Sequence, residues 1–119
     1  MKLPEDGMLL RIFVAESDQY KGKALYEHIL ITARQLNLAG ATVLRGIMGF
    51  DANSRMHSAK ILQLSQDLPV VIEIVDIQEN LNKILPVLDD IVGEGLMTLE
   101  KVRVIKYRHR QPYIPPDTA

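Results

Sequence analysis

The feature that most constrains the fold is the order in which two hydrophobic patterns follow one another along the chain. Apolar residues that alternate with other side chains, or that form a short β-branched run, predict strands at 8–15, 41–48, 69–75 and 99–107. Apolar residues spaced three and four apart predict helices at 23–36 and 79–92. The resulting order, βαββαβ, predicts a ferredoxin-like α+β fold: an antiparallel four-stranded sheet with two helices on one face and a long loop between strands 2 and 3.

Breaker residues set the expected ends of the helices. Gly40 follows the first helix and is expected to reverse the chain there. Pro86 lies inside the second helix, where its missing N–H should free the carbonyl of Asn82 and kink the helix. The segment 93–95, Gly-Glu-Gly, should end that helix.

Length and composition fit a single domain over residues 1–119, with an N-terminal tail at 1–6 and a proline-rich C-terminal tail at 108–119. The chain has no cysteine, which excludes disulfides, thiolate metal sites and cysteine nucleophiles. The start of the chain lacks a signal-peptide pattern, and no apolar run is long enough to span a membrane, so a cytoplasmic location is expected. The formal net charge of −1 gives no general attraction to nucleic acid or to membranes, so any basic site must be local.

Alternation divides the predicted sheet into two faces. The helix side should carry Leu10, Ile12, Val14, Val70, Ile72, Ile74, Val102 and Val104. The open face should carry Leu9, Phe13, Val43, Ile47, Val71, Val75 and Ile105, with the charged residues Arg11, Arg45, Glu73 and Arg103 among them. So large an apolar face predicts a homo-oligomer packed sheet to sheet, and the alternative is a monomer whose tail folds back over the face.

The connection at 49–68 is much longer than the handful of residues that two antiparallel strands need. Its first part is turn-rich, and its second part alternates in a way that could extend the third strand outward. A passive hairpin extension or an arm that clasps an oligomer would explain the length without a ligand. Arg55, His57 and Lys60 are candidates for contact with a ligand or a partner protein.

GATVLRGIMGF ahead of the long connection, followed by LPVVIEIVD, resembles the PII signal-transduction proteins. Four segments resemble more closely a PII-like family of bacterial and archaeal domains of unknown function. They are LLRIFVAESDQYKGKALYEHIL, AGATVLRGIMGF, RMHSAKILQLSQDLPVVIEIVD and VGEGLMTLEKVRVIKY, which together cover nearly the whole chain. The resemblance implies a homotrimer of ferredoxin-like protomers that binds an adenine nucleotide in the clefts between subunits. It also implies that the long connection, the T-loop of these proteins, reports the bound ligand to a partner protein.

The resemblance assigns ligand-binding residues as well. Gly46 and Gly49 correspond to the T-loop base, and Gly93 and Gly95 to the short B-loop after the second helix. Lys106, Arg108 and Arg110 correspond to the basic end of the last strand. The three cations, spaced by two, would also form a ladder for phosphate or carboxylate oxygens along an extended chain, although a basic terminus is often simply solvated. Glu94 stands where a phosphate-binding PII protein offers a cation, so a nucleotide other than ATP, or a small anion, is the alternative ligand.

No catalytic constellation is visible, and the sequence therefore predicts a protein that is not an enzyme. Serines 54, 58 and 65 lack a base partner, and histidines 28, 57 and 109 lack the spacing of a metal-ligand pair. Glu16 and Asp18 could bind a hard cation, but acidic residues before a helix more often cap turns. Two other functions stay open: a divalent-metal tolerance protein resembling the CutA family, which shares the trimeric ferredoxin-like architecture, and a small enzyme that uses its sheet face as a pocket.

Overall fold

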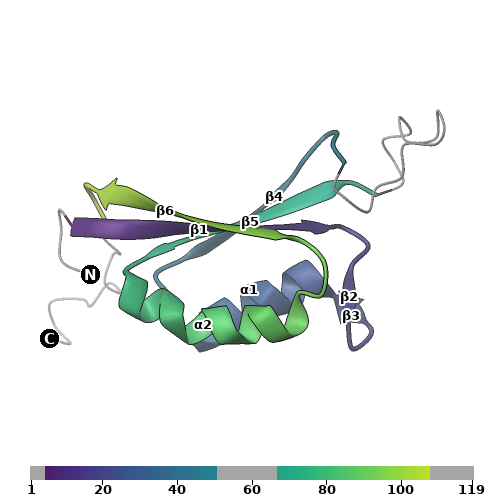
Figure 1. Ribbon diagram of the computed structural model, residues 1–119, viewed down its shortest axis with the longest axis horizontal. Helices are drawn as coiled ribbons and strands as arrows, with labels where there is room; N and C mark the ends of the chain where they lie inside the picture. Colours follow the sequence, from purple (N-terminus) through teal and green to yellow (C-terminus); the bar gives the residue numbers. More distant parts are fainter. Residues whose placement is uncertain (1–4, 51–66, 108–119) are drawn as a thin grey trace, which may run out of the picture.

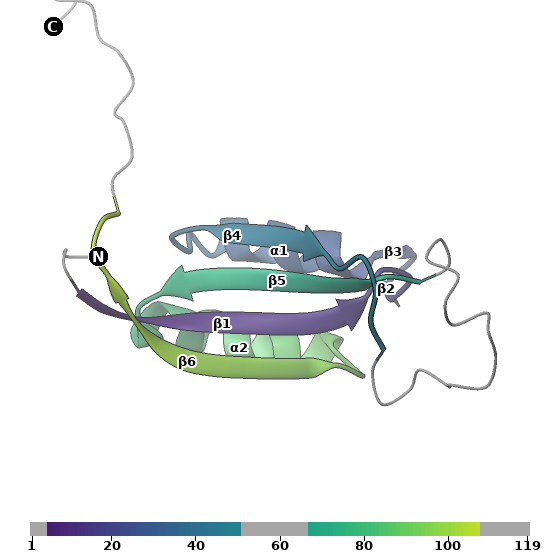
Figure 2. The ribbon, with the colours of Figure 1, turned by 90° about the horizontal axis from the view of Figure 1, so that it is seen from above.

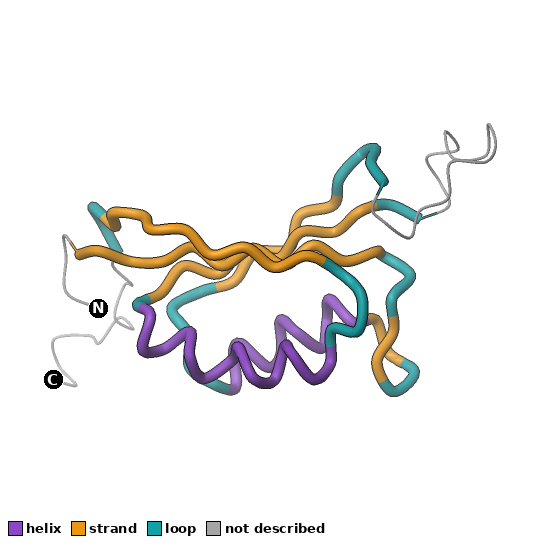
Figure 3. The backbone as a smooth tube through the Cα atoms, in the orientation of Figure 1, coloured by secondary structure: helices purple, strands orange, loops and turns teal. Residues whose placement is uncertain are grey.

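The computed structural model describes residues 5–50 and 67–107. A four-stranded antiparallel sheet carries two helices on one face and leaves the other face open (Figure 1). The strands are β1 (Glu5–Ala15), β4 (Ala41–Arg45), β5 (Pro69–Asp76) and β6 (Leu96–Val104), in the spatial order β4-β5-β1-β6. The helices are α1 (Leu25–Gln35) and α2 (Gln78–Ile91), both on the same side of the sheet (Figure 3). The predicted ferredoxin-like fold is confirmed.

The core lies between the sheet and the helices. Ile12 of β1 is paired with Ile72 of β5, and both side chains are fully buried. The other buried apolar residues come from the same two strands and from both helices: Leu10, Val14, Leu25, Ile29, Ala33, Val70, Ile74, Leu81, Ile84, Leu88 and Ile91. In the described part of the chain, neither helix is long and apolar enough to cross a bilayer.

A short hairpin between β1 and α1 was not expected, because the sequence there reads as a loop. Its strands are β2 (Gln19–Tyr20) and β3 (Lys23–Ala24). The two central residues, Lys21 and Gly22, have φ angles of 51° and 79°, as a type I′ turn requires. The hairpin packs on α1, since the Tyr20 and His28 rings lie 4.6 Å apart.

The strand register corrects three of the predicted apolar face assignments. Val43 is paired with Ile72 of the core, so it lies on the helix side and not on the open face. Val102 and Val104 belong to the open face and not to the helix side, because Val102 is paired with Gly7. A Cβ on Gly7 would lie 3.1 Å from Val104 Cγ2, in agreement with this register. Alternation within a strand separates two sets of residues, and only the pairing decides which set faces the helices.

The same register corrects two of the four predicted charged residues. Arg45 and Arg103 are on the helix side of the sheet, whereas Arg11 and Glu73 are on the open face as predicted. Ile47 and Ile105 lie just beyond the ends of β4 and β6 and are strongly exposed. Strands β4 and β6 also differ from their expected bounds, since β4 ends at Arg45 and β6 runs from Leu96 to Val104.

Asn37, and not Gly40, reverses the chain after α1. Asn37 has a φ of 58°, and its N–H donates to the carbonyl oxygen of Arg34 at 3.0 Å. The N–H of Leu38 donates to the carbonyl oxygen of Ala33 at 3.1 Å, which completes a Schellman motif. In the second helix, α2 continues through Pro86 and ends at Ile91.

Candidate functional site

The two glycines predicted at the base of the long connection lie against one proline ring. The N–H of Gly46 donates to the carbonyl oxygen of Pro69 at 2.7 Å. A Cβ on Gly46 would lie 2.7 Å from Pro69 Cγ, and one on Gly49 would lie 3.0 Å from the same atom. The glycines therefore let the outgoing chain pass directly over the residue where the returning strand begins.

The turn between β1 and β2 holds both ends of the connection. On the outgoing side, Arg45 Nη2 lies 2.6 Å from Glu16 Oε1. On the returning side, the N–H and the hydroxyl of Ser17 donate to the two carboxylate oxygens of Asp67 at 3.0 and 2.9 Å. The N–H of Glu16 also donates to the carbonyl oxygen of Leu68 at 2.9 Å. These contacts make the root of the connection a defined structure.

The structure assigns local partners to both carboxylates that were weighed as a hard-cation site. Glu16 is paired with Arg45, and Asp18 Oδ2 accepts the N–H of Ala15 at 3.0 Å, as a turn cap does. Within residues 5–50 and 67–107, no group of three or more histidines and carboxylates is placed to hold a metal ion.

The Gly-Glu-Gly turn joins α2 to β6 at the same end of the sheet as the root of the connection. A Cβ on Gly95 would lie 2.6 Å from the carbonyl oxygen of Phe13, whereas one on Gly93 would meet nothing within 4 Å. Phe13 is two residues from Ala15, which is paired with Pro69. Gly95 is thus required by close backbone approach, and Gly93 is not.

Lys106 lies at the opposite end of the sheet. Val104, two residues before it, is paired with Glu5 at the start of β1, whereas the glycines surround the end of β1 (Figure 2). Ten residue steps along a strand span about 34 Å. A single chain therefore does not bring Lys106 to Gly46, Gly49 or the Gly-Glu-Gly turn. Of the predicted site residues, Arg108, Arg110, Arg55, His57 and Lys60 lie outside the described residues.

Lys106 borders a shallow depression of about 410 Å³ on the open face. It is lined by Glu73, Val75, Val104, Lys106 and Tyr107, together with residues 39–42 at the start of β4. The Tyr107 hydroxyl donates to the carbonyl oxygen of Ala39 at 2.9 Å, so the segment after β6 crosses the sheet end toward β4.

The open face consists of alternating rows of residues that run across the sheet. One row is apolar on all four strands: Leu44, Val71, Phe13 and Leu96. Its two outer members, on the edge strands, are 48% and 57% exposed. The next row is polar: Thr42, Glu73, Arg11 and Thr98.

Arg11 is the centre of an ion-pair network on this face. Its Nε lies 2.8 Å from Glu73 Oε2, and its Nη1 lies 2.7 Å from Glu100 Oε1. The hydrogen bond that Arg11 donates to the Glu73 carboxylate is the largest cause that raises the pKa of Arg11. Arg11 is therefore paired with two carboxylates of its own chain, which sequence alternation alone did not specify.

Sequence reasoning missed Asp76, the one buried charged residue among those described. Its carboxylate accepts the N–H groups of Ala39 and Ile77, each at 2.7 Å, and the side-chain amide of Asn80 at 2.9 Å. It thereby ties the start of α2 to the segment that leads into β4. The available signal was an acidic residue that ends an apolar strand directly before a helix.

The sequence matches known proteins over most of its length. The family model described as "Uncharacterized ACR, COG1993", DUF190, matches residues 7–104. A UPF0166 protein of Aquifex aeolicus (strain VF5) is 41% identical over 99 residues, which cover 82% of this chain and 91% of the relative. The chain belongs to the DUF190 family. A UPF0166 protein of Methanocaldococcus jannaschii is 36% identical with the same coverage of both chains.

The DUF190 chain also shares its fold with a solved PII-like protein. The structure is that of CPII bound to ADP and bicarbonate, from Thiomonas intermedia K12. The TM-score is 0.63 at 13% sequence identity, over 86% of this chain and 91% of that chain. Membership of the family of unknown function that the sequence resembles is confirmed, and the chain shares the fold of CPII.

Proposed function

We propose that this DUF190 protein is a PII-like, non-catalytic regulator that assembles as a homotrimer. It binds a small anionic ligand of the adenine-nucleotide class in the clefts between subunits. The connection at 49–68 transmits the state of the cleft to a partner protein. The observation that carries this proposal is the separation of the site residues onto opposite ends of β1.

A second copy of the chain would bring the two groups of site residues together. The root of the connection and the Gly-Glu-Gly turn share one end of the sheet, and Lys106 follows the strand that ends at the other. An extended basic segment cannot cover about 34 Å of sheet within its own chain and still stay paired to the start of β1. A neighbouring protomer can supply its own basic end to the loop base, which makes the ligand site a property of the assembly.

The open face supplies the surface on which copies would pack. Its apolar row continues across all four strands, and exposed apolar area of this kind marks interfaces. Arg11 neutralises only one of the two carboxylates that it contacts. Lys106 borders the same depression as Glu73 and offers the second positive charge, so the face can be buried without net charge.

The ligand class follows from the groups that would meet in such a cleft. The main chain at Gly49 and in the Gly-Glu-Gly turn would donate N–H groups to an anion, whereas the Gly46 N–H is held by the Pro69 carbonyl oxygen. Lys106, Arg108 and Arg110 would supply cations. Because CPII was solved with ADP and bicarbonate, ADP is the first nucleotide to test here. Glu94 would place a carboxylate near the phosphates, which favours a ligand with less phosphate charge than ATP.

Thermal unfolding with a panel of ligands tests the proposal. ADP, ATP, AMP, cyclic nucleotides and divalent metal ions are added to the wild-type protein, and a ligand present at 100 times its Kd stabilises the folded state by about 2.7 kcal/mol. We expect ADP to raise the Tm, and expect the double variant Arg108→Ala/Arg110→Ala to lose this shift. The exposed cation Lys101, changed to alanine, is the control and should keep the shift. Nucleotide-independent melting would refute the proposal, and a shift with divalent metals alone would favour the CutA-like function.

A further inference from the structure

An apolar groove lies beside α1, on the helix side of the sheet. It has a volume of about 340 Å³ and is lined by Leu30, Ile31 and Arg34 of α1 and by Leu38, Gly40 and Ala41 of the segment that enters β4. Leu30 is 37% exposed and Ile31 is 52% exposed. Ala33 of α1 completes the lining among the described residues.

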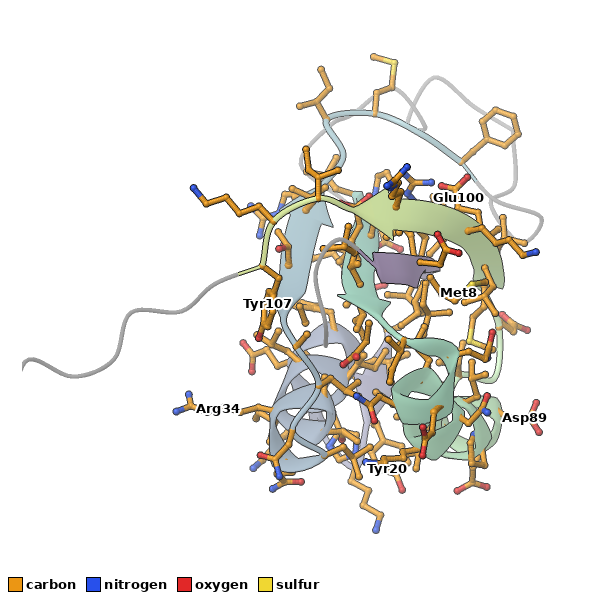
Figure 4. All side chains as sticks on the ribbon, turned by 90° about the vertical axis from the view of Figure 1, so that its left-hand side faces the viewer. Met8, Tyr20, Arg34, Asp89, Glu100 and Tyr107 are labelled. Atoms are coloured by element: carbon orange, nitrogen blue, oxygen red, sulfur yellow. The ribbon has the colours of Figure 1, made fainter. Side chains whose placement is uncertain are left out.

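We propose that the segment 113–116 of the same chain, Tyr-Ile-Pro-Pro, docks in this groove. The described part of the chain ends close to this groove. The hydroxyl of Tyr107 donates to the carbonyl oxygen of Ala39, which fixes the last described residue beside the segment that lines the groove. The depression that Tyr107 borders and the groove share Gly40 and Ala41 as lining residues. Figure 4 shows Tyr107 and Arg34 on the same side of the molecule.

The chain after Tyr107 can also reach along the groove. Between Tyr107 and Tyr113 the chain can span up to about 20 Å. From Arg34 back to Leu30 along the helix is about 6 Å. The tail is therefore long enough to run the length of the groove from its anchored end.

The segment 113–117 and the groove also match in polarity and charge. The segment 113–116 is apolar, and its two prolines limit the conformational freedom that docking would remove. Asp117 follows directly, and Arg34 is the one charged residue among those that line the groove. An apolar tetrapeptide followed by a carboxylate thus matches an apolar groove with an arginine at its wall.

Docking would have a consequence for the basic end of the chain. Tyr107 anchors one side of the segment 108–112, and the groove would anchor the other. Arg108 and Arg110 would then be held close to the sheet end instead of extending into solvent. The docked tail would set the direction in which these cations are presented, whatever anion they bind.

A paramagnetic label tests the docking in the full-length protein. The chain has no cysteine, so Thr118→Cys provides a single site for a nitroxide. We expect loss of the methyl NMR signals of Leu30 and Ile31, with those of Leu85 and Val87 on α2 retained. The tail variant Tyr113→Ser/Ile114→Ser should restore the lost signals without changing the folded core. The polar tail variant Gln111→Ser is the matched control and should leave them lost.

Isotope mixing identifies which chain supplies the tail. Isotope-labelled chains without nitroxide are refolded together with unlabelled chains that carry it. If each tail occupies the groove of its own chain, the Leu30 and Ile31 signals persist in this mixture. Their loss in the mixture would overturn the proposal in favour of a neighbouring copy as the occupant. Retention of both signals in the singly labelled protein would show that the tail does not dock there.

Discussion

Replacing Gly46 with alanine should loosen the root of the long connection. The added Cβ would lie 2.7 Å from Pro69 Cγ, closer than real Cβ contacts allow. A proline ring cannot rotate away as a flexible side chain would, so the backbone must shift. That shift would strain the 2.7 Å hydrogen bond from the Gly46 N–H to the Pro69 carbonyl oxygen. Overpacking of this kind costs about 1–3 kcal/mol.

Hydrogen exchange at the amide of residue 46 measures this effect locally. A loss of about 1–3 kcal/mol raises the population of the open root by about 5- to 150-fold, and the exchange rate rises with it. The same free energy should appear in urea unfolding, provided that protein concentrations are matched, because association contributes to the stability of an oligomer.

Gly93→Ala is the matched control. A Cβ on Gly93 would meet nothing within 4 Å, and surface substitutions of this kind change stability by no more than about 0.5 kcal/mol. Equal stability and equal exchange for Gly46→Ala and Gly93→Ala would refute the steric account of the root.

Three further substitutions test other parts of the account. Glu94→Lys should strengthen ATP binding relative to ADP, because it replaces a carboxylate that would repel the phosphates, and the effect should be smaller at high salt. Calorimetric titration in low and high salt measures both affinities, and an unchanged ratio of ATP to ADP affinity would contradict the prediction. Arg11→Met leaves two carboxylates without their cation on the open face and should raise the dissociation constant of the proposed trimer in sedimentation, while Lys101→Met leaves it unchanged; equal assembly of both variants would argue against packing through this face. Asp76→Asn weakens the three hydrogen bonds that the buried Asp76 carboxylate accepts and should cost about 1–3 kcal/mol of unfolding free energy in urea, whereas the exposed Asp89→Asn should cost almost nothing; similar values for the two would remove the proposed role of Asp76.

The element order was predictable because each pattern is local. The β-branched run at 69–75 and the apolar spacing of 79–92 each specify one element, and β5 and α2 form where those patterns lie. The faces of the edge strands were less predictable. Val43 and Val102 alternate as expected, but their side of the sheet depends on pairing with residues far away in the sequence.

The candidate site was predictable in its parts and not in its arrangement. Gly46 and Gly49 lie at the base of the connection, where the chain passes over Pro69, and their role in ligand binding stays a prediction. The distance between them and Lys106 follows from the length and register of β1, which no local pattern reveals. The ion pairs that link Arg11 to Glu73 and Glu100 are also products of register.

Mixed assemblies test most directly the central claim that one ligand site takes its two halves from different chains. One variant carries Gly49→Val, which damages the loop base, and the other carries Arg108→Ala/Arg110→Ala, which removes the basic ladder. Each should fail to bind ADP alone. When the two are refolded together in equal amounts, about one quarter of the clefts should combine an intact loop base with an intact ladder, and ADP binding should return at that level. A mixture that binds no ADP, although the wild-type protein does, would contradict the claim and place the whole site within one chain.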